Sequence, residues 1–170
     1  MISITAFGAA ILLNLSIDPW RAINDGVMGG VSSGGMSEFD EGLRFEGSLS
    51  LENNGGFASV RRTLLEDLSN TKIVRLVVRG DGRRYQLRLH QQGPFEGVSW
   101  THSFDTRSEW QALELYYSDF KPMYRGRPVP AAGPLEPNRI SKLGFLIGDK
   151  NPGEFHLDIG RIEFIKADMH

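Results

Sequence analysis

Hydrophobic and polar residues alternate along several stretches of the chain, and this period of two predicts β-strands. In residues 43–52, apolar side chains occupy one face, and charged side chains and serines the other. Residues 85–90 and 112–117 alternate in the same way. The apolar positions of these three stretches are Leu43, Phe45, Leu49, Leu51, Tyr85, Leu87, Leu89, Leu113, Leu115 and Tyr117. Each stretch is therefore predicted to be a strand with one face in the core and one in solvent.

Two shorter runs, residues 73–78 and 143–147, are apolar at almost every position. Continuous apolar runs of this length are typical of strands that are covered on both faces, so we expect both at sheet centres. In the last stretch, the alternation that begins at Phe155 changes parity across Gly160 and resumes at Ile162. This change indicates a β-bulge in a bent final strand.

Clusters of Gly, Asn, Asp and Pro separate these runs, and the chain holds 20 glycines, which suits many tight connections. No stretch of about 12 residues has a helical period, although residues 64–68 and 138–142 are expected to form a helical turn or two. Many short amphipathic strands predict an all-β sandwich or barrel, because two such sheets bury their apolar faces against each other.

Length and composition favour a single domain, residues 1–170. A chain of 170 residues, 40% of them hydrophobic, buries a core without disulfides or metals. The net charge of −2, with 19 basic residues scattered among 21 acidic ones, argues against a nucleic-acid partner. The chain has no cysteine, which excludes a thiolate nucleophile and a Cys-ligated zinc.

The apolar residues 2–15 lack the basic start of a signal peptide and are too few to span a membrane. We interpret them as a buried first strand of a cytoplasmic protein that does not span the membrane. Residues 118–137 carry five prolines, which remove backbone donors and fix φ, so this segment is predicted to be a packed loop and not a central strand. Loops of about 20 residues are usually functional, which makes this one a candidate partner surface.

Residues 20–34 are too rich in glycine for a helix and too irregular for a strand. Glycines permit positive φ, while Asn24 and Asp25 can accept hydrogen bonds from backbone amides. We therefore predict a rigid loop whose residues are mainly structural, with Met28 either plugging the core, which we prefer, or contacting an apolar partner. The candidate residues of this loop are Trp20, Asn24, Asp25, Gly26, Met28, Gly29, Gly30 and Ser32.

In this loop the sequence resembles the complex I intermediate-associated protein 30 family, whose signature is a Trp followed by an Asn-Asp-Gly-Val-Met-Gly-Gly-x-Ser run. Further similarity lies in residues 56–61, 85–89, 110–127, 140–149 and 153–157. The resemblance implies a jelly-roll β-sandwich of two antiparallel sheets, similar to galactose-binding and carbohydrate-binding modules. It also implies a protein partner, because mitochondrial members are chaperone-like assembly factors of the respiratory NADH:ubiquinone oxidoreductase. We expect residues 20–34 and the proline-rich residues 118–137 to be the surfaces that contact it.

The polar faces of the central strands form a second candidate site. If these strands are neighbours, they bring together Arg61, Gln86, Arg88, His90 and Trp100. Arginine and glutamine make planar hydrogen-bonded pairs and tryptophan stacks on sugars, so the platform would bind a carbohydrate or a peptide. The alternative is an ordinary solvated face with Trp100 in the core. Carbohydrate binding is thus the alternative function to protein binding.

Motifs of catalysis are missing from the sequence, so we predict no catalytic residues and no cofactor. The four histidines lack a Gly-x-Ser-x-Gly elbow or a His-Glu-x-x-His pair, and the glycine-rich loop lacks a phosphate-binding lysine. A hydrolase is a distant third hypothesis. No Asp-x-Asp-x-Asp loop supports a metal, although a structural calcium was considered near Asp18, Asp40, Asp149 or Asp158.

Overall fold

The computed structural model describes residues 10–167, without the side chains of Val27, Met28 and Asn54. Most of the predicted first strand, residues 2–9, and the position of the Met28 side chain therefore lie outside the described residues. Within them, no helix is long and apolar enough to cross a membrane.

The described residues form two antiparallel sheets. The six-stranded sheet has the order β3 (Ser33–Phe39), β4 (Gly42–Leu49), β13 (Gly153–Lys166), β6 (Thr71–Gly80) and β9 (Gln111–Tyr116), with β1 (Ala10–Leu12) also paired to β13. The seven-stranded sheet has the order β11 (Arg127–Pro128), β10 (Lys121–Tyr124), β8 (Ser99–Asp105), β7 (Arg84–Gln91), β12 (Ile140–Ile147), β5 (Ala58–Thr63) and β2 (Trp20–Ala22). Short 3₁₀ turns connect them: η1 (Asp25–Met28), η2 (Glu52–Asn54), η3 (Tyr117–Asp119), η4 (Pro130–Ala132) and η5 (Pro137–Arg139).

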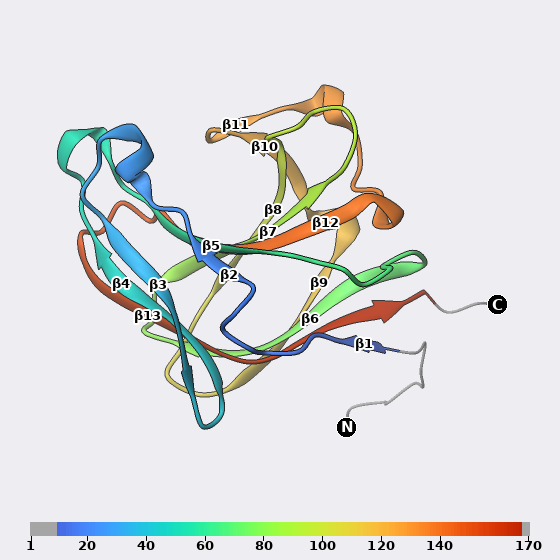
Figure 1. Ribbon diagram of the computed structural model, residues 1–170, viewed down its shortest axis with the longest axis horizontal. Coiled ribbons are helices and arrows are strands. Elements are labelled where there is room, and N and C mark those ends of the chain that lie inside the picture. Colours follow the sequence, from blue (N-terminus) through green and yellow to red (C-terminus); the bar gives the residue numbers. More distant parts are fainter. Residues whose placement is uncertain (1–9, 168–170) are drawn as a thin grey trace.

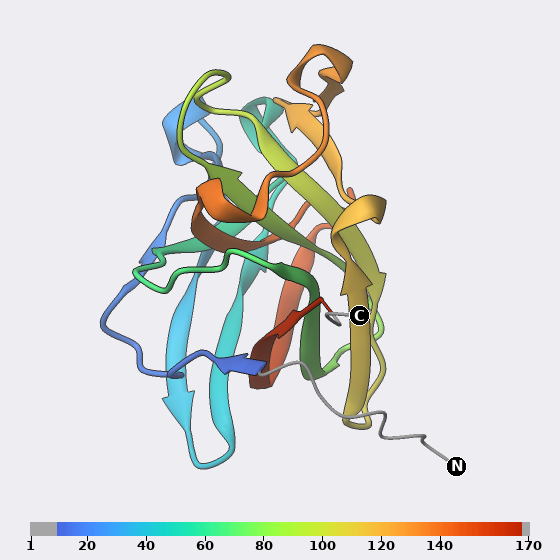
Figure 2. The ribbon, with the colours of Figure 1, turned by 90° about the vertical axis from the view of Figure 1, so that its right-hand side faces the viewer.

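The two sheets pack face to face, with β5, β7 and β12 above β6 and β13 in Figure 1. Aromatic rings join the layers: Tyr85 of β7 lies edge-on to Phe45 of β4 at 6.3 Å and to Phe155 of β13 at 6.4 Å. The β3–β4 hairpin projects beyond the sandwich at one end (Figures 1 and 2). This arrangement confirms the predicted all-β sandwich.

Most of the predicted inward faces are confirmed. Leu43, Phe45, Tyr85, Leu87 and Leu89 are each fully buried. Leu51 was placed wrongly on the apolar face of its strand: β4 ends at Leu49, and Leu51 is 44% exposed because the chain leaves the sheet towards η2.

The central strands and the bulge are confirmed as well. Strand β6 lies between β13 and β9, and β12 lies between β7 and β5. The pairing of β13 with β6 shifts register between Ile159 and Arg161, so the bulge falls at Gly160 as expected. A Cβ at Gly160 would lie 3.0 Å from the Trp110 ring, which explains the need for glycine there.

Three local expectations need correction. Residues 64–68 contain no helical turn, and of residues 138–142 only the first two belong to the turn η5, because β12 begins at Ile140. In residues 118–137 the chain forms the β10–β11 hairpin, since edge strands tolerate proline. Residues 20–34 are not a single loop but contain β2, η1 and the start of β3.

Candidate functional site

The outer face of the seven-stranded sheet collects basic side chains from strands that are distant in sequence. Arg88 on β7 lies opposite Thr101 on β8 and opposite Gly144 on β12. Gly144 in turn lies opposite Arg61 on β5. With the edge strands, one row crosses the sheet in the order Lys121, Thr101, Arg88, Gly144, Arg61 and Arg21. We call these six positions the basic row.

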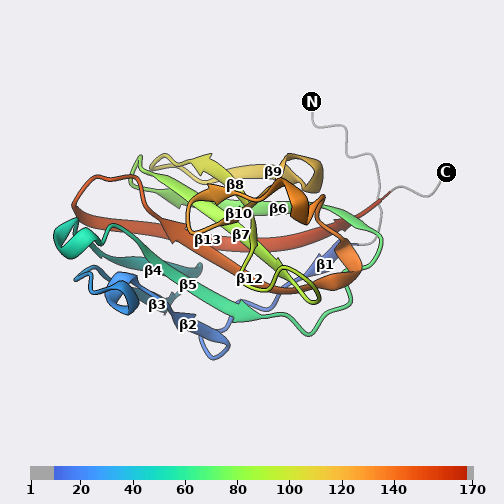
Figure 3. The ribbon, with the colours of Figure 1, turned by 90° about the horizontal axis from the view of Figure 1, so that it is seen from above.

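Polar residues flank the basic row on the same face. One pleat along, His90 of β7 lies opposite Lys142 of β12. On the other side, Gln86 of β7 lies opposite Ser103 of β8, and its Oε1 accepts a hydrogen bond from Arg88 Nε at 3.1 Å. Figure 3 looks onto this sheet, where β8, β7, β12 and β5 follow one another across the view.

Four of the five predicted platform residues thus lie together, namely Arg61, Gln86, Arg88 and His90, but Trp100 does not join them. Trp100 is paired with Leu89, so its side chain points to the core face, where it is fully buried. Its indole Nε1 donates to the carbonyl oxygen of Gly133 at 3.0 Å. His102 shares this inward parity and lies edge-on to Phe120 at 5.3 Å. The stacking residue expected on the platform is therefore absent from it.

The electrostatics of this face are those of crowded, partly desolvated cations. Burial lowers the pKa of Arg88 to about 10, and the positive charge of Arg61 adds to this shift. Burial also lowers the pKa of Arg61. For His90, burial and then the charges of Arg61, Arg88 and Lys142 lower the pKa to about 3, so its imidazole is neutral at pH 7. Arg88 remains charged at that pH.

A hollow of about 640 Å³ opens on this face beside the basic row, with Arg61, His90 and Lys142 in its lining. The exposed Glu96, from the β7–β8 loop, is the acidic residue in that lining. Nε2 of His90 is buried and has no hydrogen-bond partner among the described residues. The hollow therefore presents the cations Arg61 and Lys142 to an incoming group, whereas Nε2 of His90 is buried.

Residues 24–32 form a different feature, centred on the fully buried Asp25. Its carboxylate accepts hydrogen bonds from the backbone N–H groups of Ser32 (2.9 Å), Gly56 (2.7 Å) and Phe57 (3.3 Å), and from the Ser32 hydroxyl (2.6 Å). Burial alone would raise the pKa of Asp25, but these hydrogen bonds outweigh it and hold the pKa below its ordinary value. The carboxylate thus links the segment between β2 and β3 to the segment before β5.

The neighbours of Asp25 in the signature also engage the backbone. Asn24 Nδ2 donates to the carbonyl oxygen of Gly34 at 3.1 Å, and Asn24 Oδ1 accepts from the Ser59 N–H at 3.1 Å. Trp20 is buried and lies 5.9 Å from the Phe145 ring. Gly29 ends η1 with φ +87°, a conformation that favours glycine, whereas Gly26 has open space where a Cβ would be.

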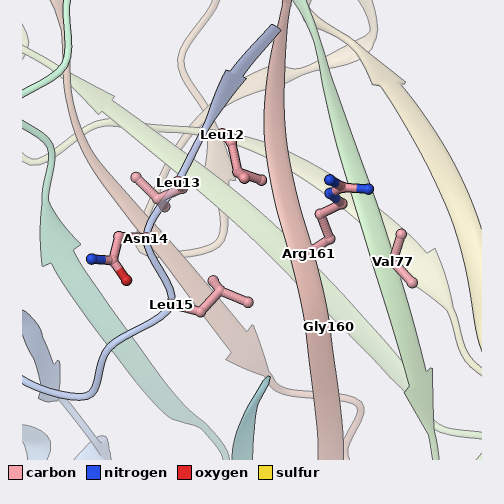
Figure 4. Close-up of a pocket in the computed structure, with 7 residues that line it drawn as sticks. All are labelled: Leu12, Leu13, Asn14, Leu15, Val77, Gly160 and Arg161. Carbon is pink, nitrogen blue, oxygen red and sulfur yellow. The ribbon is translucent and has the colours of Figure 1, made fainter. Parts of the chain in front are cut away.

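A second hollow, of about 700 Å³, lies on the outer face of the other sheet between β1 and β13. In Figure 4, Leu12 and Leu15 extend towards β13, while Asn14 points away from it. Arg161 is its one charged lining residue. This hollow is mainly apolar and offers little polar chemistry.

Two of the four aspartates considered for calcium form ion pairs. Asp158 lies between Arg44 (2.6 Å) and Arg79 (2.7 Å), and Asp149 pairs with Arg83 (2.6 Å). Throughout residues 10–167 there is no group of three His, Cys, Asp or Glu residues that could hold a metal ion.

Sequence reasoning missed Arg21, Lys121 and Lys142, which share the face with Arg61 and Arg88. These residues stand on strands whose order cannot be read locally from the sequence. For Trp100 a signal was present, because Val98, Trp100 and Phe104 share one parity while Ser99, Thr101 and Ser103 share the other. That pattern indicates an inward tryptophan.

Comparison with solved structures places the fold among carbohydrate-binding modules. A family 11 module from Clostridium thermocellum, solved with a β-1,3-1,4-mixed-linked tetrasaccharide, superposes with a TM-score of 0.70 at 16% identity, over 97% of this chain and 100% of that one. The module of the cellulase Lic26A-Cel5E of the same organism gives 0.71 at 17% identity, over 97% and 99%. These likenesses confirm the jelly-roll fold.

Comparison of sequences identifies relatives. A Mus musculus protein named complex I intermediate-associated protein 30, mitochondrial, is 28% identical over 91% of this chain and 54% of its own length. The Drosophila melanogaster protein of that name is 30% identical over 59% of this chain and 36% of its own length. An uncharacterised Schizosaccharomyces pombe protein is 27% identical over 88% and 79%. The chain thus spans about half of the mouse relative.

A family model described as complex I intermediate-associated protein 30 matches residues 11–159, which include the Asp25 hydrogen bonds and every strand of the basic row. The match covers most of the chain. The chain therefore belongs to the complex I intermediate-associated protein 30 family.

Proposed function

We propose that this chain is a non-catalytic binding protein of the assembly-factor type, which holds a protein partner on the outer face of the seven-stranded sheet. The names of the mouse and Drosophila relatives describe association with intermediates of complex I. By extension, the partner of this chain is a subunit or an assembly intermediate of a respiratory enzyme. We further propose that the chain acts in the cytoplasm, a location that fractionation of its source cells tests.

The observation that carries the choice of surface is the grouping of Arg61, Gln86 and Arg88 on one open sheet face. The guanidinium groups of Arg61 and Arg88 each have several N–H donors. Of these donors, only Nε of Arg88 makes a hydrogen bond to a side chain among the described residues, and its acceptor is Oε1 of Gln86. The side chains of Asn24, Asp25 and Ser32, in contrast, already make hydrogen bonds inside the fold. The sheet face is thus available for a partner, and the signature segment maintains the fold beside it.

The β10–β11 hairpin borders the same face and forms part of the proposed surface. Met123 is half-buried and Tyr124 is 44% exposed, so the hairpin offers apolar contacts at the rim of a polar face. A mixed surface of this kind, with exposed aromatic and arginine side chains, is typical of protein interfaces.

Carbohydrate binding is the second candidate, and the observation that favours it is the similarity to modules such as the one solved with a tetrasaccharide. Arg61, Gln86 and Arg88 could hydrogen-bond sugar hydroxyls. The position of Trp100 in the core weakens this candidate, because it removes the predicted stacking ring from the face.

The experiment is affinity capture from the source cells, with recovered proteins identified by mass spectrometry. Wild type is compared with Arg88→Gln and with Lys72→Gln, which changes an exposed residue on β6 of the other sheet. We expect wild type and Lys72→Gln to recover subunits of a respiratory enzyme and Arg88→Gln to lose them. Recovery of none by wild type, together with glycan-array binding that Arg88→Gln abolishes, would support the carbohydrate alternative instead.

A further inference from the structure

We propose that the basic row selects its partner by charge, and that this face binds an extended segment of a partner protein carrying carboxylates at about every third residue. The inference rests on the proposed function, since it names the chemistry of that partner. It is carried by the position of Arg88 and Arg61 on either side of Gly144, by the lack of ion pairs on these arginines and by the spacing of the row.

The cations of this face form no ion pair among the described residues, although Glu96 lies in the lining of the same hollow. Among the described residues, no Asp or Glu oxygen lies within 4.0 Å of a charged nitrogen of Arg61, Arg88, Lys142, Lys121 or Arg21. Elsewhere the fold supplies such acids: Arg44 and Arg79 share Asp158, and Arg83 has Asp149. Arg61 and Arg88 therefore lack the carboxylate partner that Arg44, Arg79 and Arg83 have.

A half-buried guanidinium without a carboxylate is an unfavourable arrangement, because it has lost part of its hydration and no ion pair replaces the lost water contacts. Arg88 and Arg61 are both half-buried, and each disfavours the charge of the other. An incoming carboxylate accepts bidentate hydrogen bonds from a guanidinium and neutralises this repulsion. An anion is thus expected to bind this face more tightly than a neutral group of similar shape.

Spacing distinguishes an extended segment from a small anion. Neighbouring strands are about 4.8 Å apart, so Arg88 and Arg61, separated by β12, lie about 10 Å apart along the row. Four strands separate β10 from β2, and the row therefore spans about 24 Å. A segment in the polyproline II conformation advances about 3.1 Å per residue with three residues per turn, so about eight residues cover the row. Acids three residues apart then share one face about 9 Å apart, which matches the two arginines.

Gly144 on β12 places no side chain between the two arginines. It is buried, and a Cβ there would lie 2.7 Å from the carbonyl oxygen of Val60, so the strand packing itself requires glycine at this position. The hydroxyl of Thr101 and the amide of Gln86 lie on the same face and can hydrogen-bond a peptide backbone. The net charge of −2 for the whole chain favours this local recognition over a nucleic acid, which requires a broad basic surface.

The test uses fluorescent nine-residue peptides with glutamate at every third position, and matched peptides with glutamine or lysine there. Fluorescence anisotropy at about 50 mM salt measures the Kd. We expect the glutamate peptide to bind at least about 10-fold more tightly than either control, and to weaken when salt is raised to about 200 mM. Equal binding of the glutamine peptide would overturn the inference.

Variants locate the peptide. We expect Arg88→Gln to weaken binding of the glutamate peptide by about 10-fold and Lys142→Gln to weaken it by about 3-fold. Lys72→Gln should leave this binding unchanged. Lys142 is exposed, so its replacement reports on binding without disturbing the core, and circular dichroism checks the fold of every variant. Equal weakening by Lys72→Gln, or tighter binding of a single-stranded oligonucleotide or an acidic oligosaccharide of the same charge, overturns the proposal.

The two proposals fail in different ways. If cellular capture of respiratory subunits depends on Arg88 but the glutamate peptide neither binds nor competes, the acidic-segment inference is wrong and the proposed function stands. If the peptide binds and wild type captures no such subunit, the inference stands and the assembly-factor function is wrong.

Discussion

Asp25 leaves no room for a side chain at Gly30, because a Cβ there would lie 2.6 Å from Oδ1 of the aspartate. Gly55 is confined in the same way, with its Cβ position 2.5 Å from Oδ2. The aspartate is thus enclosed by two glycines and by the amides that bind it. The glycines of this region owe their place as much to close packing as to backbone freedom.

Replacement of Gly30 by alanine is expected to lower the free energy of unfolding by about 2 to 3 kcal/mol, because the methyl group displaces the Asp25 carboxylate from its donors. Gly35→Ala is the matched control, since nothing lies within 4 Å of its Cβ position. Urea unfolding of the two variants measures the difference. Equal losses at the two positions would contradict the role assigned to Gly30.

Asp25→Asn should destabilise the fold by about 3 kcal/mol at pH 7, because the amide group places N–H donors against backbone N–H donors. The pKa of Asp25 is lowered on folding, so its contribution is present above the unfolded value of about 3.9 and is lost as the pH falls through the folded value. Below about pH 4 the gap between wild type and variant should therefore narrow. Unfolding curves between pH 7 and pH 3 test this, and a gap independent of pH would contradict it.

His90 should give the protein a second pH dependence at higher pH. Its pKa falls from about 6.5 in the unfolded chain to about 3 in the fold, through burial and the charges of Arg61, Arg88 and Lys142. Its contribution to stability is complete above about pH 6.5 and is lost as the pH falls towards 3, by about 1 kcal/mol per pH unit. His90→Gln should flatten this slope in urea unfolding, whereas His156→Gln, which changes an exposed residue, should keep it.

Asp158 is 1% exposed and binds two arginines, so Asp158→Ala should cost about 3 to 5 kcal/mol by leaving Arg44 and Arg79 without their partner. The exposed pair of Arg75 and Glu114, 2.9 Å apart, provides the comparison. Glu114→Gln should change the stability by less than about 1 kcal/mol. Thermal unfolding ranks the two variants, and a similar effect of both would show that burial does not decide the strength of these pairs.

Much of the fold could be predicted because strand alternation is local. Leu87 and Leu89 are assigned to the core by their neighbours alone, and the shift at Gly160 is visible in the same pattern. The candidate site could be predicted only in part, because it depends on which strands lie side by side. Arg88 and Arg61 lie near each other on one sheet face only because β12, which is distant in sequence, pairs with both β7 and β5.

The hydrogen bonds of Asp25 show the same limit. Two of its donors, the N–H groups of Gly56 and Phe57, follow it by 31 and 32 residues. The sequence indicates an aspartate that accepts hydrogen bonds from backbone amides. Local sequence patterns cannot identify donors that lie more than 30 residues away.

Strand β11 at the margin of the seven-stranded sheet has a consequence for how molecules meet. It is two residues long, Arg127–Pro128, and one of them has no backbone N–H. Exposed sheet margins are templates on which another chain can add a strand, and natural proteins interrupt them with prolines and charges. At this margin a foreign strand would meet one cationic residue and one proline, too little to start a ladder, so β11 protects this side of the sheet from extension.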